Sequence, residues 1–474
     1  MGCSGHLPAG GVRAAMTGIA SRPRLLYDLT GLLHWYGYFR RPAGVQRMIE
    51  KIGACALFQE AAARVPGAAC HVEFVVRVLG SDSFLRVDPS LLVALNHDRA
   101  RAMAEMRRTF ADSLQRAPFR GLVREGRYFH IPYLVRGLAQ RSTSSLTAIA
   151  PPGPNDAFFS PGDLWWQAGY AAALARLKQR TGVRLLQAVH DFYVEQRRDW
   201  SPAGFSQVFA RELSAIAPHV DHWLTPSQAV KRQLLNRLTQ WSLPKPPVSV
   251  LTYGWDTFAP PAHLPPSADR GILGRHGIDR RPYILFVGTI EPRKNVDALL
   301  NAMEALRAEL GQRVPDLVVV GGYGWRAGRL RQRLRRGARD GRLFWLQNLN
   351  DGELAAVYRG ARFSVMPSLG EGFGLAIQES LGHGVPCIAM ARDETREAGR
   401  DLATYVGPDG SDLKGRIARW ILDEQVLAAS RQRIARRLTK GGLPSWNETG
   451  RLVLTSAFGE AAQASAPSAA ALQL

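Results

Sequence analysis

The stretch from Ser368 to Ala389 reads SLGEGFGLAIQESLGHGVPCIA and contains the most informative pattern in the chain. An apolar run before it predicts a strand, the Gly372-Phe373-Gly374 triplet predicts a tight turn, and the following residues predict a helix. The turn lets the backbone approach a ligand closely, and the free N–H groups at the start of the helix suit a phosphate. Glu371 lies just before that helix, and Glu379 lies about two turns along it. The two carboxylates can therefore hold two ends of one elongated ligand.

Strands and helices alternate outward from this stretch in both directions. Beyond residue 282, strands are expected over 283–287, 317–320, 343–346, 363–366 and 387–389, with a helix between each pair. Toward the N-terminus the alternation is less regular, with strands expected over 24–28, 71–79, 184–189, 223–225 and 248–252. This alternation predicts a parallel, doubly wound sheet in each half of an α/β protein. Two such halves place a ligand cleft between them, at the carboxyl ends of the strands.

A proline-rich stretch separates the two halves. The residues TFAPPAHLPPSADRG, from 257 to 271, contain four prolines and interrupt the alternation, which is typical of a linker. We predict a flexible segment over 1–23, an N-terminal Rossmann-like domain over 24–256, a linker over 257–281, a C-terminal Rossmann-like domain over 282–440, and a helix and tail over 441–474 that cross back to the first domain.

Composition excludes several classes of protein. A chain of 474 residues with 46% hydrophobic residues and 11 Trp is not disordered. Its four Cys are far apart, which excludes a disulfide framework and a Cys-rich zinc site and fits a reducing compartment. No run of 18 apolar residues occurs, and the first 23 residues lack the apolar centre of a signal peptide. We therefore expect a cytoplasmic protein.

The pair Glu371-x7-Glu379 within EGFGLAIQESLGHGVPCIA closely resembles the signature of the group 1 family of retaining, nucleotide-sugar-dependent glycosyltransferases. The resemblance implies the GT-B fold, in which two Rossmann-like domains face each other across a cleft, with the donor on the C-terminal domain and the acceptor on the N-terminal one. It also implies that Glu371 faces the donor sugar as a catalytic residue and that Glu379 holds the ribose hydroxyls. The residues expected to contact the sugar and the diphosphate are Gly372, Phe373, Gly374 and Leu375.

A second motif, FVGTIEPRKN over residues 286–295, follows a predicted strand. Gly288 frees the exit from the strand, and the adjacent cations Arg293 and Lys294 repel each other unless an anion lies between them. A solvated basic turn explains the pair equally well when it is taken alone. The resemblance assigns diphosphate binding to this segment, so we expect Gly288, Arg293 and Lys294 to bind the donor.

The N-terminal half holds two further candidates. The opening loop of residues 27–47 resembles the family's first loop, which implies that Gly44 approaches the donor phosphate, although many relatives have two glycines where this chain has Ala43-Gly44. Arg47 faces either the cleft or the solvent. His190 ends a predicted strand and, by resemblance, lies beside the donor sugar and acceptor as a catalytic residue, with a structural histidine as the alternative.

Taken together, these residues predict a retaining, metal-independent glycosyltransferase of cell-surface polysaccharide biosynthesis. It would move a hexose, with mannose as the first guess, from a nucleotide sugar to a saccharide or lipid-linked saccharide. No Asp-x-Asp occurs, so we expect no metal, and no cofactor besides the nucleotide-sugar co-substrate. The alternatives are a nucleotide-sugar epimerase on the same fold and an anionic-polymer-binding protein. Known nucleic-acid motifs are absent, so nucleic acid is not an expected partner.

The chain carries a formal net charge of +21. Arginines gather over residues 99–141 and again over 326–342. The first group lies in the acceptor-side domain, where a basic surface would suit peripheral binding to the anionic inner face of a membrane. Coding bias in a chain rich in Ala, Arg and Gly explains the excess equally well.

Overall fold

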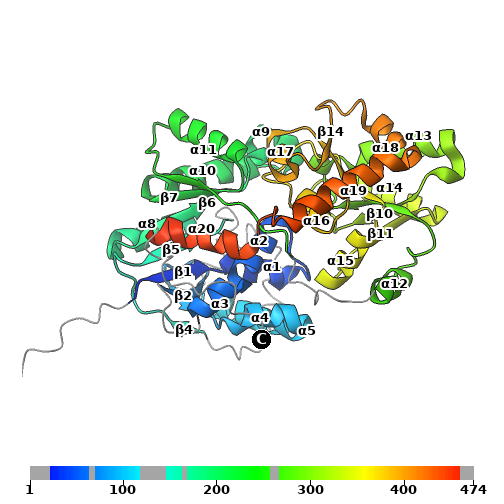
Figure 1. The fold of residues 1–474 in the computed structure, drawn as a ribbon. Helices are drawn as coiled ribbons and strands as arrows, with labels where there is room; N and C mark the ends of the chain where they lie inside the picture. Colours follow the sequence, from blue (N-terminus) through cyan, green and yellow to red (C-terminus); the bar gives the residue numbers. More distant parts are fainter. Residues whose placement is uncertain are drawn as a thin grey trace, which may run out of the picture.

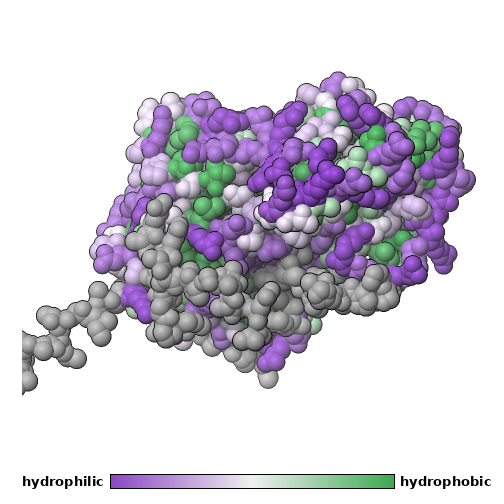
Figure 2. Space-filling model, in the orientation of Figure 1, coloured by the Kyte–Doolittle hydropathy of each residue, from purple (hydrophilic) through white to green (hydrophobic). Residues whose placement is uncertain are grey.

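The computed structural model describes residues 22–62, 70–117, 146–162, 167, 169–256 and 266–459. Figure 1 shows two lobes side by side, each built on one sheet. The face shown in Figure 2 is largely hydrophilic over the C-terminal lobe, with small, separate apolar patches. No helix within the described ranges is long and apolar enough to cross a bilayer.

The N-terminal sheet has eight strands in the order β4-β3-β2-β1-β5-β6-β7-β8. The pairs from β2 to β8 are parallel, whereas β3 pairs with its two neighbours in antiparallel fashion at one edge. Its central strands β1, β5, β6 and β7 are almost entirely buried because helices cover both faces. The strands are β1 (Arg24–Asp28), β2 (His71–Arg77), β3 (Phe84–Arg86), β4 (Thr147–Ala148), β5 (Ala157–Ser160), β6 (Arg184–Ala188), β7 (His222–Thr225) and β8 (Val248–Val250).

Helices connect these strands and pack on the sheet. The sequence predicts Ser227 as the N-cap of one of them, and this is confirmed, because the Ser227 hydroxyl accepts a hydrogen bond from the backbone N–H of Val230 at 3.2 Å. The helices are α1 (Thr30–Tyr38), α2 (Gly44–Ala54), α3 (Ala56–Ala62), α4 (Ser90–His97), α5 (Arg99–Gln115), α8 (Tyr170–Thr181), α9 (Tyr193–Gln196), α10 (Phe205–Ile216) and α11 (Gln228–Gln240).

The C-terminal sheet is six-stranded and parallel, in the order β11-β10-β9-β12-β13-β14. Its strands are β9 (Tyr283–Val287), β10 (Asp316–Val320), β11 (Leu343–Leu346), β12 (Phe363–Met366), β13 (Cys387–Met390) and β14 (Thr404–Val406). Its helices are α12 (Pro266–Arg275), α13 (Val296–Leu310), α14 (Gly328–Gly337), α15 (Asp351–Gly360), α16 (Leu375–Gly382), α17 (Asp393–Gly399), α18 (Leu413–Leu422) and α19 (Glu424–Thr439).

The last helix, α20 (Trp446–Phe458), returns to the N-terminal domain and packs against α2, α3 and β6 (Figure 1). Its start is tied to the segment that leaves that domain. The Trp255 N–H donates to the Pro444 carbonyl at 3.1 Å, and the Trp446 N–H donates to the Asp256 carboxylate at 2.8 Å. The chain therefore leaves and re-enters the N-terminal domain at adjacent places.

Two local predictions differ from the structure. The expected linker over 257–281 contains helix α12, whose first residue is Pro266 and which packs on α15; proline at a first helical position is well tolerated. The single helix expected over 45–63 is two helices, α2 and α3, separated at Cys55, where the backbone is extended. Both pack against α20, a contact between residues about 400 apart that no local pattern contains.

Candidate active site

A cleft of about 1200 Å³ lies between the two domains. The carboxyl ends of β6 and β9 and the N-terminal turns of α2 and α16 border it. This is the position that two facing doubly wound sheets predict for a ligand. Every residue that the sequence predicts for the site lines this cleft: Gly44, His190, Gly288, Arg293, Lys294, Glu371, Gly372, Phe373, Gly374, Leu375 and Glu379.

The structure brings Glu371, Arg293 and Lys294 together in one ion cluster. The Arg293 guanidinium lies 3.0 Å from Glu371 Oε2, and the Lys294 ammonium pairs with Glu371 Oε1. Burial alone would raise the pKa of Glu371, but the two cations outweigh it and lower the pKa to about 2. Burial lowers the pKa of Lys294 despite this pairing. Glu371 is therefore an ionised carboxylate held in a defined orientation.

Further contacts fix Arg293 from both domains. Its Nε lies 2.6 Å from Glu291, and its guanidinium lies 5.6 Å from the ring centroid of Tyr193, which comes from the N-terminal domain. Burial opposes the charge of Arg293, but Glu291 and Glu371 outweigh it and raise its pKa. The short helical turn Pro292–Lys294 presents both cations to the cleft.

Glu379 lies in a second ion cluster that crosses the domain boundary. Arg47 Nε of helix α2 lies 2.9 Å from Glu379 Oε1, and Arg47 Nη1 lies 3.5 Å from Asp351 of α15. Lys51, one turn further along α2, pairs with Asp351 at 2.6 Å. The Tyr358 hydroxyl donates to Glu379 Oε2 at 3.0 Å. Arg47 therefore faces the cleft, which the sequence left open, and Asp351 is a cleft residue that sequence reasoning did not single out.

Glycines permit the close approaches that shape the cleft. A Cβ on Gly372 would lie 2.1 Å from the His190 carbonyl oxygen, so the two domains meet here only because residue 372 has no side chain. Within the C-terminal domain, Gly321 permits a similar close approach to Gly288, whose carbonyl oxygen would lie 2.0 Å from a Cβ at residue 321. Gly374 caps α16 with a φ of 109°, a value that favours glycine. A Cβ on Gly44, by contrast, would meet no protein atom within 4 Å.

His190 lines the cleft with both ring nitrogens engaged. Nε2 lies 2.6 Å from the Pro161 carbonyl, and Nδ1 lies 3.0 Å from the Tyr253 hydroxyl. Since a carbonyl only accepts, Nε2 carries the proton and Nδ1 accepts from Tyr253. Burial lowers the pKa of His190 to about 4, so the ring is neutral. These two hydrogen bonds fix the His190 ring in the wall of the cleft. Its catalytic role remains a prediction.

The remaining glycine-loop residues have different surroundings. Phe373 is buried and packs edge-on against Tyr253, with ring centroids 5.4 Å apart. Leu375 begins α16 and is half-buried. No side chain caps the N-terminus of α16, so its first N–H groups point free of a protein side-chain acceptor. The helix start therefore keeps donors available for an anion.

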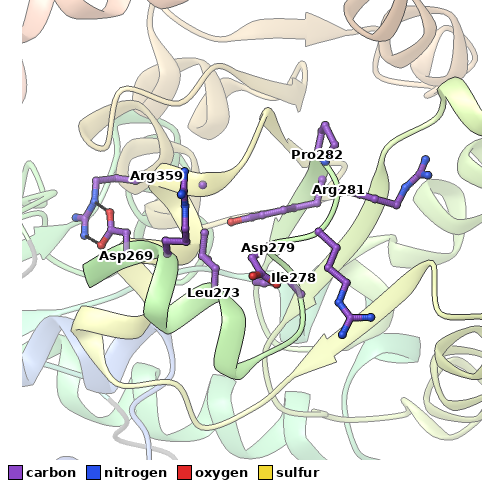
Figure 3. Close-up of a pocket in the computed structure, with 11 residues that line it drawn as sticks. Asp269, Leu273, Ile278, Asp279, Arg281, Pro282 and Arg359 are labelled. Carbon is purple, nitrogen blue, oxygen red and sulfur yellow. Dashed lines mark hydrogen bonds and ion pairs between the residues drawn. The ribbon is translucent and has the colours of Figure 1, made fainter. Parts of the chain in front are cut away.

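Within the described ranges, no group of three or more His, Cys, Asp or Glu residues is arranged to hold a metal ion. A second, smaller pocket of about 380 Å³ lies at the amino end of β9, beside α12 and α15 (Figure 3). There Arg359 pairs with Asp269 through two hydrogen bonds of 2.6 Å, so this pair brings no free charge. The pocket lies at the opposite end of the strands from the cleft.

Comparisons with known proteins match a large part of the C-terminal half of the chain to one protein family. Residues 272–440 match the family model described as "Glycosyl transferases group 1". The serotype-specific mannosyltransferase WbdA of Escherichia coli is 30% identical over 242 residues, which cover 49% of this chain and 29% of that protein. The O-antigen chain mannosyltransferase B of E. coli is 36% identical over 141 residues, 30% of this chain and 37% of that protein. This chain thus matches well under half the length of these relatives.

A solved structure extends the comparison to the whole fold. The sucrose-phosphate synthase of Thermosynechococcus elongatus superimposes with a TM-score of 0.57 and 18% identity, covering 92% of this chain and 98% of that one. The two facing α/β domains and the cleft between them define a protein of the GT-B fold class, as the sequence predicts. Residues 272–440 form a domain of the group 1 glycosyltransferase family.

Proposed function

We propose that the protein is a retaining glycosyltransferase that moves a hexose from a nucleotide sugar to a saccharide acceptor without a metal ion. The observation that carries the proposal is the ion cluster of Arg293, Lys294 and Glu371 in the cleft of a group 1 glycosyltransferase domain. A buried carboxylate between two cations is a preorganised polar site, and such sites stabilise charge that develops during a reaction.

In this mechanism the donor diphosphate lies near Arg293, Lys294 and the free N-terminus of α16. As the bond from the anomeric carbon to the diphosphate oxygen breaks, its electron pair stays on that oxygen, which the cations and the helix N–H groups stabilise. The acceptor hydroxyl oxygen then bonds to the anomeric carbon from the same face and passes its proton to the departing phosphate oxygen. Glu371 accepts hydrogen bonds from the donor sugar and orients it.

Two features support a role for the N-terminal domain and for Glu379. Among the described residues, none packs closely enough on Gly44 to require a glycine there, and the small residue leaves room for a ligand at the first turn of α2. Glu379 is buried, and among the described side chains Tyr358 and Arg47 contact its carboxylate, which suits an acceptor for two ribose hydroxyls. Gly44 and Glu379 already line one cleft, and closure of the domains would enclose a donor bound there.

The donor sugar and pathway rest on the relatives alone. WbdA and O-antigen chain mannosyltransferase B are both named as mannosyltransferases. We therefore propose GDP-mannose as donor and a cell-surface polysaccharide, free or lipid-linked, as acceptor.

A donor panel tests the proposal. The full chain is incubated with GDP-mannose, UDP-glucose and UDP-N-acetylglucosamine, and melting temperature and sugar transfer to mannose oligosaccharides are measured; a true donor raises the melting temperature. Arg293→Ala and Glu371→Gln should each lower kcat/KM at least about 100-fold. Arg419→Ala, a change at an exposed arginine on α18, serves as the control and should leave kcat/KM unchanged.

The reaction products distinguish a retaining glycosyltransferase from a nucleotide-sugar epimerase. Retention predicts that the new glycosidic bond has the anomeric configuration of the donor, which NMR coupling constants report. An epimerase would instead convert or release the nucleotide sugar at the same rate with and without acceptor. Full activity in both site variants would contradict the assignment of the cluster.

A further inference from the structure

Helix α14 and the turn after it carry exposed arginines that pair with no other described residue. Arg329, Arg335 and Arg336 on the helix, and Arg339 in the following turn Ala338–Asp340, are all exposed. None of the four forms an ion pair or side-chain hydrogen bond with another described residue. Because these arginine side chains are exposed and unpaired, packing against other described residues does not hold them in place.

The four positions share one face. At about 100° per residue, they fall together with Gln332 inside an arc of about 120°. The buried residues Leu330 and Leu334 lie on the opposite side of the helix, against the sheet. The result is a narrow solvent-facing band of positive charge.

Acidic groups near the band do not neutralise its charge, and the stability of the helix does not explain that charge. Two acidic residues of α13 pair with Arg333, which lies 3.0 Å from Asp297 and 2.8 Å from Glu304, and the third, Glu309, lies 2.5 Å from Lys414. Asp340 lies next to the band, in the turn that holds Arg339. The helix dipole favours cations in the last turn of α14 but disfavours Arg329 in its first turn. Helix stability alone therefore does not explain a cation at both ends.

The basic residues of α5 differ in this respect. The sequence predicts a membrane-facing surface over 99–141, but Arg99 pairs with Glu50, Arg108 with Glu105, and Arg116 with Asp112. Residues 118–145 lie outside the described part of the chain. Among the described residues of α5 and α14, the α14 band therefore holds the denser group of unpaired cations.

The band also reaches the cleft. Tyr323, in the loop between β10 and α14, lines the cleft and is 54% exposed. The Arg331 guanidinium lies 4.4 Å from its ring centroid, so Tyr323 joins the edge of the band to the cleft mouth. An exposed tyrosine is a side chain that suits a membrane–water interface.

We propose that the α14 band, defined by Arg329, Arg335, Arg336 and Arg339, docks the protein on an anionic lipid surface. A cation near such a surface strengthens binding about fivefold, and salt weakens the attraction. A lipid surface fits better than a nucleic acid, because single-strand binding sites interleave aromatic side chains with cations, whereas the face of α14 that carries this band holds only Arg and Gln and Tyr323 lies at its edge. Docking would place the cleft mouth near a lipid-linked acceptor, a consequence that rests on the proposed function, whereas the docking itself does not.

Vesicle co-sedimentation of the full chain tests the proposal. The probes are vesicles of phosphatidylcholine alone and vesicles of phosphatidylcholine with phosphatidylglycerol, each at low and at physiological salt. The test variant carries R329Q, R335Q, R336Q and R339Q. The control variant carries R86Q, R180Q, R419Q and R451Q, which remove equal charge from exposed, scattered positions. Circular dichroism verifies that both variants fold.

The wild type and the control variant should bind the phosphatidylglycerol vesicles, and the test variant should bind them at least about 100-fold more weakly. Binding should fall with salt and be negligible on phosphatidylcholine alone. Equal loss in both variants, equal binding to neutral vesicles, or no binding by the wild type would overturn the proposal. So would band-dependent binding to RNA or DNA at physiological salt without vesicle binding. These outcomes do not depend on sugar transfer, so they stand apart from a failure of the proposed function.

Discussion

Arg47 Nε lies 2.9 Å from Glu379 Oε1, and this contact joins helix α2 of the N-terminal domain to helix α16 of the C-terminal domain. The charge on Arg47 is stabilised although burial opposes it, because Glu379 and Asp351 raise its pKa. The same carboxylate is the one that we propose for the donor ribose. The domain contact and the proposed donor site therefore share one side chain.

Arg47→Ala should weaken the contact between the domains. It would leave Glu379 with Tyr358 as its remaining polar contact, and a buried carboxylate that loses its cation costs on the order of 3 kcal/mol. The chain is expected to open, so its radius of gyration in small-angle scattering should rise. Arg47→Lys should show a smaller change, since Lys keeps the charge but not the fork of donors. Identical scattering curves for wild type and Arg47→Ala would contradict the prediction.

Gly372→Ala should force the domains apart or strain the loop. The new Cβ would lie 2.1 Å from the His190 carbonyl oxygen, and a backbone atom cannot move away as a flexible side chain can. We expect a loss of stability of about 1–3 kcal/mol in urea unfolding. Gly415→Ala on α18 is the matched control, because a Cβ there meets nothing within 4 Å and alanine favours a helix. Equal stability of the two variants would argue against a tight contact at residue 372.

His190 predicts a specific pH dependence of stability. Its pKa falls from an ordinary 6.5 to about 4 on folding, so between these values the unfolded chain binds a proton that the native chain does not. His190 should therefore add no pH dependence above about pH 6.5 and should cost stability as the pH falls toward 4, by about 3 kcal/mol in total. In His190→Gln this part of the dependence should vanish, as measured by urea unfolding at several pH values. A parallel pH profile in the variant would show that another group is responsible.

Glu397 should stabilise helix α11 from the opposite domain. Its carboxylate accepts hydrogen bonds from the N–H groups of Gln228 at 2.7 Å and Ala229 at 2.9 Å, the first donors of that helix. Glu397→Ala should cost about 1 kcal/mol, as the loss of a helix cap does. The control Asp393→Ala removes an exposed ion pair with Arg232 on the same helices and should change stability by less than about 0.5 kcal/mol. Comparable losses in the two variants would not fit a capping role.

Local patterns predicted the C-terminal domain well. The strand Tyr283–Val287 and the helix Leu375–Gly382 have the bounds expected from the sequence, because apolar runs bounded by glycine and proline are strong local signals. The cluster of Glu371 with Arg293 could be anticipated only through resemblance to the family, because these residues lie 78 positions apart.

The contacts between domains could not be predicted from local patterns. The sequence did not decide whether Arg47 faces the cleft or the solvent, because its pairing with Glu379 depends on how two separate domains face each other. The same holds for His190, whose neutral state comes from burial and whose ring nitrogens contact Pro161 and Tyr253 from other elements. Side chains whose environment is built by distant segments carry no local signal.

The paired segments near Trp255 and Pro444 set how the domains can move. Residues 255–256 and 444–446, where the chain leaves and re-enters the N-terminal domain, are hydrogen-bonded to each other, so we expect this pair of segments to act as a hinge. A Cβ at Gly254 would lie 2.3 Å from the Trp446 nitrogen, so the two strands have no room to slide past one another. We therefore expect the cleft to open by rotation about this pair of segments. The rim opposite the hinge travels farthest, and residues near the hinge change little between open and closed forms.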